Sequence, residues 1–372
     1  MKFSINQAEL ANALSIVMKG ISNRSTLPVL SGILMSAEGD LLVLQATDLE
    51  VSIKFSCAAL IEEPGSTVVP GKLCSDIVRS LPDAAVHFEG DDDGLNITCD
   101  SSSFSMKTLS AQDFPAFPEV EPEQTISMPF GVFSSMVKRV ARVVSKDESR
   151  AILTGVLITF EEGRLRMVAT DSFRLAIAET SLEDAGADDF QAVIAGTTLA
   201  EIATMPKTES PVQLALAENQ IMITCNDTVF INRRIEGNFP NYKQLLPDVC
   251  ATKATFEVDR VAAAVKRVSI VGSAKSATGA GAHSVAMSFN GPSQTMQLAS
   301  SQQDVGSAQE TVGGTIEGED MEIRFSCQYV LDGLSAVRGD TVTIEVQAPL
   351  KPGIFREEGP ESYLYLLMPT HF

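Results

Sequence analysis

The sequence predicts an α+β protein made of three tandem copies of one domain, and three observations support this prediction. A strand-like segment that ends in Ala-Thr-Asp at residues 41–48 recurs at residues 165–171. Helical and alternating apolar patterns follow one another in the same order in each third of the chain. The length of 372 residues suits two or three domains of roughly 150 residues each. A repeat this long can bury its own core, so the copies are expected to be sequential domains rather than turns of a solenoid.

The spacing between matching segments stays nearly constant along the repeat. Ile-Thr-Cys at residues 97–99 recurs at residues 223–225. A third, fainter copy begins at Phe256, and residues 296–300 occupy the place where the other copies carry Ala-Thr-Asp. The predicted domains are therefore residues 1–124, 125–250 and 251–372.

Apolar periodicity predicts two helices and several short strands in each copy. Apolar residues at helical spacing predict the first helix of each copy at residues 7–19, 130–145 and 259–270. The second helix is predicted at residues 72–80, 198–204 and 327–337. Pro82 and Pro206 follow the first two of these, as proline commonly follows a helix end. Alternation with period two predicts strands that include residues 41–46, 86–88, 95–99 and 342–346.

The charge distribution carries more information than its sum. The formal net charge of −20 gives a far field that repels phosphate. Basic residues nevertheless gather on the predicted first helices. In the second copy they are spaced by four along one helical face, with Arg139 adjacent, at Lys138, Arg142, Lys146 and Arg150. In the third copy they are Arg260, Lys266 and Arg267. A solvated amphipathic face is one interpretation, and the recurrence favours a shared surface that faces phosphate.

The sequence gives little support for an enzymatic function. The three histidines are scattered, and no glycine-rich loop with lysine is present to hold a nucleotide phosphate. Asp48 and Asp171 could be metal ligands of a nuclease, but their equivalence in the repeat favours a role in turns. The six cysteines lack metal-ligand or redox spacing and are expected to be small buried residues. We therefore expect no catalytic residue, no metal and no cofactor.

The sequence predicts a cytoplasmic protein. No apolar run approaches the roughly 18 residues that a transmembrane helix needs. The first residues enter a strand and helix pattern directly, without the features of a signal peptide.

Several short segments are weak motifs alone but specific in their order and spacing. They are Arg24–Leu30, Ala46–Glu50, Asp113–Pro115, Thr170–Ala176, Phe239–Tyr242 and Tyr365–Pro369. With them the chain resembles the bacterial DNA sliding clamp, the beta subunit of DNA polymerase III, over essentially its full length. The resemblance implies three clamp domains per chain and a head-to-tail homodimer that forms a six-domain ring.

The resemblance implies a polymerase processivity factor that encircles duplex DNA without reading its sequence. It implies a non-catalytic subunit of the polymerase holoenzyme, with no membrane partner. The implied partners are double-stranded DNA, a second copy of the chain, polymerase subunits, a clamp-loader ATPase and other proteins with clamp-binding peptides. Weak phosphate contacts suffice for such a ring, because topology rather than affinity retains it.

The resemblance also implies a pocket for partner peptides between the second and third domains. Its mostly apolar walls suit a groove that anchors a peptide. Carried over by position, its residues are Leu153, Thr170, Ser172, Phe173, Arg174, Leu175, Pro240, Gln244, Leu245, Leu350, Pro352, Leu366, Met368, Pro369, Thr370 and His371. The alternative for Leu153, Leu175 and Leu366 is that they are hydrophobic core residues and do not line the pocket. Phe173 and Gln244 depart from the family pattern, so altered peptide preferences are expected.

For DNA, the resemblance points to residues in the first two domains. They are Arg24, Lys72 and Arg79 in the first domain, and Lys146 and Arg150 in the loop after the basic helix. Relatives can carry an Arg-Lys pair where this chain has Gly196 and Thr197, so weaker phosphate binding is expected. The positions that match the dimer interface are Phe104, Met106, Ile270 and Val271.

A second function remains open at this stage. The acidic net charge and the missing basic pair would also suit a clamp-derived scaffold that binds proteins but does not encircle DNA.

Overall fold

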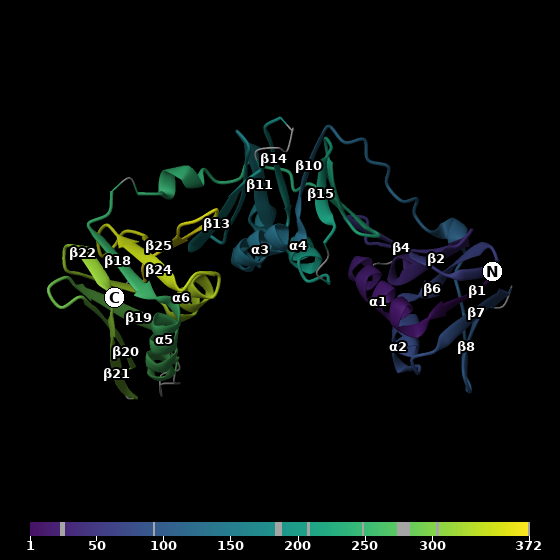
Figure 1. Cartoon of the computed structure of the whole chain (residues 1–372), viewed down its shortest axis with the longest axis horizontal. Coiled ribbons are helices and arrows are strands. Elements are labelled where there is room, and N and C mark those ends of the chain that lie inside the picture. The colour runs from purple at the N-terminus through teal and green to yellow at the C-terminus, as the bar shows by residue number, and fades with distance from the viewer. Residues whose placement is uncertain are drawn as a thin grey trace. The chain divides into compact units, whose positions relative to one another are not determined.

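The computed structural model of the chain describes residues 1–22, 27–91, 94–182, 188–206, 209–247, 249–273, 283–302 and 305–370 (Figure 1). The chain divides into two compact units. Unit 1 comprises residues 1–133 and 204–234, and unit 2 comprises residues 134–203 and 235–372. The described strands form four sheets, two in each unit, and every strand pair is antiparallel.

Unit 1 holds a five-stranded and an eight-stranded sheet. The order of the first is β5 (Leu60–Glu63), β1 (Lys2–Asn6), β7 (Ala85–Asp91), β8 (Gly94–Cys99), β9 (Ser102–Met106). The order of the second is β10 (Gln124–Pro129), β15 (Pro211–Leu216), β16 (Gln220–Cys225), β17 (Thr228–Arg233), β4 (Val51–Ala58), β3 (Leu41–Thr47), β2 (Gly32–Glu38), β6 (Gly65–Pro70). Helices α1 (Gln7–Val17) and α2 (Gly71–Ser80) pack against each other, and α1 lies against β3 and β4 (Figure 1).

Unit 2 holds a nine-stranded and a four-stranded sheet. The order of the first is β14 (Phe190–Ala195), β11 (Gly155–Glu161), β12 (Arg164–Thr170), β13 (Arg174–Ser181), β26 (Glu361–Leu367), β25 (Gly353–Glu357), β24 (Thr341–Val346), β18 (Thr252–Glu257), β22 (Thr315–Gly318). The order of the second is β21 (Gly306–Gly313), β20 (Thr295–Gln302), β19 (Ser284–Asn290), β23 (Met321–Ser326). Helix α4 (Gly196–Ile202) packs beside β14, and α5 (Val258–Ser273) and α6 (Cys327–Leu334) pack together (Figure 1).

In the part of the chain that the structure describes, the remaining helices are α3, which spans Phe130–Val140, and six short 3-10 turns. The turns are η1 (Met18–Gly20), η2 (Pro28–Ser31), η3 (Ala111–Asp113), η4 (Ala141–Val143), η5 (Glu148–Thr154) and η6 (Tyr242–Leu245). Among the helices of the described residues, none has the length and apolar content that crossing a bilayer requires.

The structure confirms three repeats, each with two α-helices and antiparallel sheets. The sheets run across the predicted domain limits, because β17 pairs with β4 and β13 pairs with β26. This pairing explains why the second repeat is shared between the two compact units. The limits at residues 124 and 250 stay a prediction.

Several predicted helices end earlier than expected: α1 ends at Val17, α4 at Ile202 and α6 at Leu334, and α3 differs most. The expectation of a helix over residues 130–145 is wrong beyond Val140, where α3 ends and η4 follows. The β-branched residues Val140, Val143 and Val144 lower helix propensity here. Arg150 has non-helical φ and ψ of −115° and 61°. The basic residues from Lys138 to Arg150 therefore do not share one helical face.

The Ala-Thr-Asp repeat is a repeated turn between two strands. In the first copy, Oδ1 of Asp48 accepts hydrogen bonds from the backbone N–H groups two and three residues further on, at 3.0 and 2.7 Å. Asp171 does the same in the second copy, at 2.9 and 3.0 Å. The residue after each aspartate has positive φ, 78° at Leu49 and 81° at Ser172. The predicted role of these aspartates in turns is confirmed.

The cysteines are mostly core residues, as predicted. Four of them are buried, and Cys57 and Cys250 are half-buried. Burial raises the pKa of the Cys74 thiol to about 12, and burial raises the pKa of both Cys57 and Cys327 to about 11.

These raised pKa values predict slow thiol chemistry in the folded protein. Only the thiolate is a nucleophile, so Cys57, Cys74 and Cys327 should resist iodoacetamide at pH 8, whereas all six cysteines should react in guanidinium chloride. Mass spectrometry of peptides from both samples measures this. Rapid labelling of Cys74 in the native protein would contradict its burial.

Candidate functional site

Several loops of unit 2 meet at one end of the nine-stranded sheet. Arg174, the first residue of β13, pairs with Leu367, the last residue of β26. Leu367 also pairs with Gly353 at the start of β25, and Gly353 pairs with Val346 at the end of β24. The segments before β13, after β26 and between β24 and β25 therefore lie at the same end of the sheet.

Predicted pocket residues from distant parts of the sequence come together at this sheet end. Phe173 directly precedes β13, residues 368–370 follow β26, and Leu350 and Pro352 lie between β24 and β25. The backbone N–H of Met368 donates a hydrogen bond to the carbonyl of Phe173 at 2.9 Å. This bond links the second repeat directly to the third.

Four of the predicted pocket residues are large hydrophobic side chains that solvent reaches. The exposed fractions are 62% for Phe173, 62% for Leu350, 49% for Leu245 and 40% for Met368. We call these four residues the apolar patch; Phe173, Leu350 and Met368 belong to segments at the sheet end, and Leu245 belongs to η6. Exposed apolar groups gathered in one region are typical of a surface that binds another molecule.

The patch rests on a buried apolar layer. Leu245 ends η6, and Tyr242 at the start of η6 packs in one core cluster with Leu175 and Leu366. Leu153, Leu175 and Leu366 are each only 1% exposed. These low exposures agree with the core interpretation of the three leucines.

The other predicted pocket residues differ in exposure. Ser172, Pro240 and Gln244 are exposed, whereas Pro352, Pro369 and Thr370 are half-buried. Thr170 is buried and donates its hydroxyl to the carbonyl of Arg174 at 2.7 Å. His371 lies outside the described residues.

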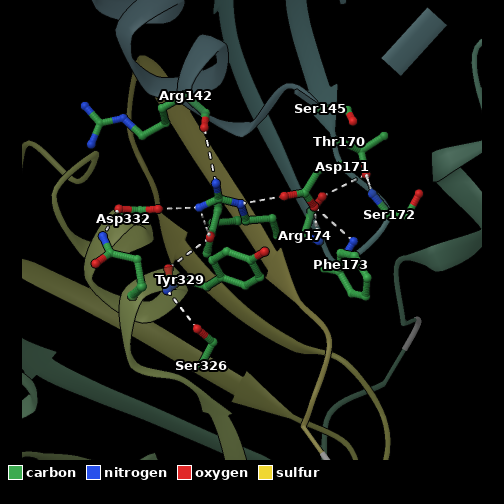
Figure 2. A network of polar contacts seen from close by, with 12 residues as sticks. Arg142, Ser145, Thr170, Asp171, Ser172, Phe173, Arg174, Ser326, Tyr329 and Asp332 are labelled. Atoms are coloured by element: carbon green, nitrogen blue, oxygen red, sulfur yellow. Dashed lines mark hydrogen bonds and ion pairs between the residues drawn. The ribbon is translucent and has the colours of Figure 1, made fainter. Parts of the chain in front are cut away.

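The Arg174 guanidinium is the centre of a polar network beside the patch (Figure 2). Its Nε is 3.0 Å from Oδ2 of Asp171, and its Nη1 is 2.5 Å from Oδ2 of Asp332. Its Nη2 donates to the carbonyl of Arg142 at 3.3 Å, and its Cζ lies 4.2 Å from the ring centre of Tyr329. The guanidinium is thus engaged on every side.

The environment of Arg174 favours its charged form. Burial alone would lower the pKa of the guanidinium, but interactions with Tyr365, Asp332 and Asp171 outweigh burial and raise the pKa above its ordinary value. Because Arg174 is nearly buried and its charge is already balanced, it offers little to a ligand directly.

A second buried arginine was not anticipated. Arg139 is 3% exposed, and its Nη2 lies 2.8 Å from Oε2 of Glu357. Its Nη1 donates to the carbonyl of Glu361 at 2.9 Å. The sequence holds a signal for this, because Arg139 follows Met136 by three residues and precedes Val143 by four, which places it on the apolar face.

The residues predicted to contact DNA are mostly at the surface. Lys72 and Arg79 are exposed on α2 of unit 1, and Arg24 lies outside the described residues. Lys138, Arg142, Lys146 and Arg150 are exposed in unit 2. Arg142 is partly engaged, because its Nε donates to the carbonyl of Lys138 at 3.0 Å and its Nη1 contacts the hydroxyl of Ser335.

The basic residues of α5 are partly neutralised by carboxylates. Arg260 lies 2.7 Å from Glu257, and Arg267 makes two bonds to Glu310, at 2.8 and 2.5 Å. Lys266 is exposed.

The residues predicted at the dimer interface lie on two elements. Phe104 and Met106 belong to β9, the edge strand of the five-stranded sheet, where Phe104 is half-buried and Met106 is buried. Ile270 and Val271 lie near the end of α5, and 68% of Ile270 is exposed. Within the described residues, no three His, Cys, Asp or Glu side chains converge as a metal site would require.

Comparisons with known proteins agree with this architecture. Family models for the N-terminal, central and C-terminal domains of the DNA polymerase III beta subunit match residues 1–118, 127–241 and 243–371. The beta sliding clamp of Synechocystis is 32% identical over 100% of this chain and 99% of its own length. The beta sliding clamp of Streptomyces coelicolor is also 32% identical over 100% of this chain and 99% of its own length.

Solved structures match over the whole chain as well. The sliding clamp of Bacillus subtilis is 27% identical with a TM-score of 0.92, over 100% of this chain and 99% of the other. A Pseudomonas aeruginosa sliding clamp bound to griselimycin is 25% identical with a TM-score of 0.91, over 100% of both chains. Three α+β repeats with this topology define the class of DNA sliding clamps. The chain belongs to the family of bacterial DNA polymerase III beta subunits and is a processivity factor for DNA polymerase.

Proposed function

We propose that two copies of the chain close head to tail into a ring of six domains that encircles duplex DNA. The full-length match to three clamp domains carries this proposal. The edge position of β9 and the exposure of Ile270 support a heterologous contact that joins the first domain of one copy to the third domain of the other. Sedimentation equilibrium should give twice the mass of one chain. A monomer would favour the alternative, a clamp-derived scaffold that does not encircle DNA. The comparisons do not favour that alternative.

The ring would hold DNA by topology, with weak phosphate contacts. The exposed cations Lys72, Arg79, Lys138, Lys146 and Arg150 can neutralise phosphates without reading bases. The net charge of −20 disfavours tight binding in open solution, so encirclement rather than affinity would retain the protein. The clamp would act in the cytoplasm as a non-catalytic subunit, opened onto DNA by a separate ATPase.

The apolar patch would bind short peptides of polymerase subunits, the clamp loader and other partners. The observation that carries this assignment is that three exposed hydrophobic side chains, those of Phe173, Leu350 and Met368, belong to segments at one end of the sheet. A peptide that places apolar anchors on the patch would bury these side chains. Griselimycin, held by the Pseudomonas aeruginosa clamp, is a suitable probe for this site.

Replacing Phe173 and Met368 together by alanine should weaken griselimycin binding by about tenfold or more. Full burial of each side chain contributes roughly 1.5–3 kcal/mol, and about 1.4 kcal/mol corresponds to a factor of ten. Isothermal titration calorimetry measures the change. Leu60→Ala is the matched control, because Leu60 is 68% exposed on β5 of unit 1 and lies outside the patch. Equal affinities for the wild type and the double variant would contradict the assignment.

A further inference from the structure

The apolar patch is built from two repeats, so its shape depends on how those repeats are held together. Phe173 belongs to the second repeat, whereas Leu350 and Met368 belong to the third. Both repeats contribute to unit 2 at this sheet end. Contacts that cross between them therefore control the distance between Phe173 and the rest of the patch.

The first repeat provides an internal control for the turn that carries Phe173. The turn after Thr47 has the same hydrogen bonds and the same positive φ as the turn after Thr170. The residue equivalent to Arg174 in the first repeat is Val51. The turn thus forms without an arginine, and Arg174 must serve another purpose.

Arg174 reaches away from its own turn to α6 of the third repeat (Figure 2). Its contacts there are the Asp332 carboxylate at 2.5 Å and the ring of Tyr329 at 4.2 Å. Gln328, one helical turn before Asp332, donates its Nε2 to Oδ1 of Asp332 at 2.7 Å and so orients the carboxylate. Nε of the same guanidinium lies 3.0 Å from Oδ2 of Asp171. Oδ1 of Asp171 accepts the backbone hydrogen bonds of the turn.

We propose that the Arg174–Asp332 ion pair positions Phe173 against the third repeat and so preorganises the apolar patch for partner peptides. This inference rests on the peptide-binding role proposed above. Arg174 and Asp332 are positioning residues in this account, because the guanidinium is engaged within the protein and does not need to touch the peptide. Binding to a preformed patch avoids the cost of ordering it.

Asp332→Asn tests the proposal, because asparagine keeps the shape of the side chain and removes its charge. Griselimycin should bind this variant about tenfold more weakly, because part of the binding free energy would then be spent on ordering Phe173. Arg174→Met should weaken binding similarly, and adding Asp332→Asn to Arg174→Met should weaken it no further. Glu310→Gln is the matched control, because it breaks an equally close arginine pair between α5 and β21 and should leave the affinity unchanged.

Fluorescence gives a readout that a general loss of stability would not change. The chain has no tryptophan and four tyrosines, so Phe173→Trp introduces a single tryptophan in the patch, which can be excited selectively at 295 nm. Asp332→Asn in that background should shift the emission maximum without ligand, whereas Glu310→Gln should not. Unchanged emission together with griselimycin affinity within about twofold of the parent protein would overturn the proposal. Failure of the wild type to bind griselimycin would instead count against the peptide-binding role itself.

Discussion

Replacing Ile270 and Val271 by aspartate is expected to convert the proposed dimer into monomers. Ile270 is 68% exposed and Val271 is half-buried near the end of α5, and the family resemblance predicts both at the dimer interface. Two carboxylates buried there without partners would lose hydration at both interfaces of the ring. We expect the dimer dissociation constant to rise by more than about a thousandfold, or about 4 kcal/mol.

Sedimentation equilibrium of the double variant measures this change. Val249→Asp serves as the control, since Val249 is 69% exposed but lies outside the predicted interface. The control should remain dimeric. A double variant that sediments like the wild type would refute the interface assignment, while leaving the peptide site untouched.

Glu357→Ala is expected to produce the largest loss of folding stability. The carboxylate of Glu357 lies 2.8 Å from the buried Arg139, and it accepts the backbone N–H of Gly339 at 2.7 Å. Burial already lowers the pKa of Arg139, and the charge of Glu357 partly offsets that effect. Without Glu357, the buried cation keeps only weaker partners. Breaking such a buried pair costs about 3–5 kcal/mol.

Urea unfolding followed by circular dichroism checks this prediction through the free energy of unfolding. Glu358→Ala is the control, because the neighbouring Glu358 side chain is 78% exposed and its ion pair with Arg356 is long, at 3.6 Å. Its loss should cost at most about 1 kcal/mol. If both variants unfolded at the same urea concentration, the buried Arg139–Glu357 pair would contribute no more to the free energy of unfolding than the exposed Glu358–Arg356 pair.

Local features of the fold could be predicted from the sequence because they depend on neighbouring residues. The periodicity of residues 7–19 gives α1, and the repeated Ala-Thr-Asp gives the turns at Asp48 and Asp171. Helical spacing alone does not predict the end of α3 at Val140, because the β-branched residues there lower helix propensity.

Features that depend on distant contacts could not be predicted in the same way. No pattern near Arg174 shows that Asp332, 158 residues away, would lie against it. The pairing of β13 with β26 likewise depends on backbone edges that meet only in the folded chain. Resemblance to a family supplied the patch residues, and the structure then separated the exposed Phe173 from the buried Leu175.

Retention on circular DNA tests the central claim most directly. The protein, loaded by its cognate clamp-loader ATPase onto a nicked circular plasmid, should elute with the DNA and be released when a restriction enzyme linearises the plasmid. Such release shows that topology holds the protein, since phosphate contacts are the same on both forms. Equal retention on circular and linear DNA, or none on either, would contradict an encircling clamp.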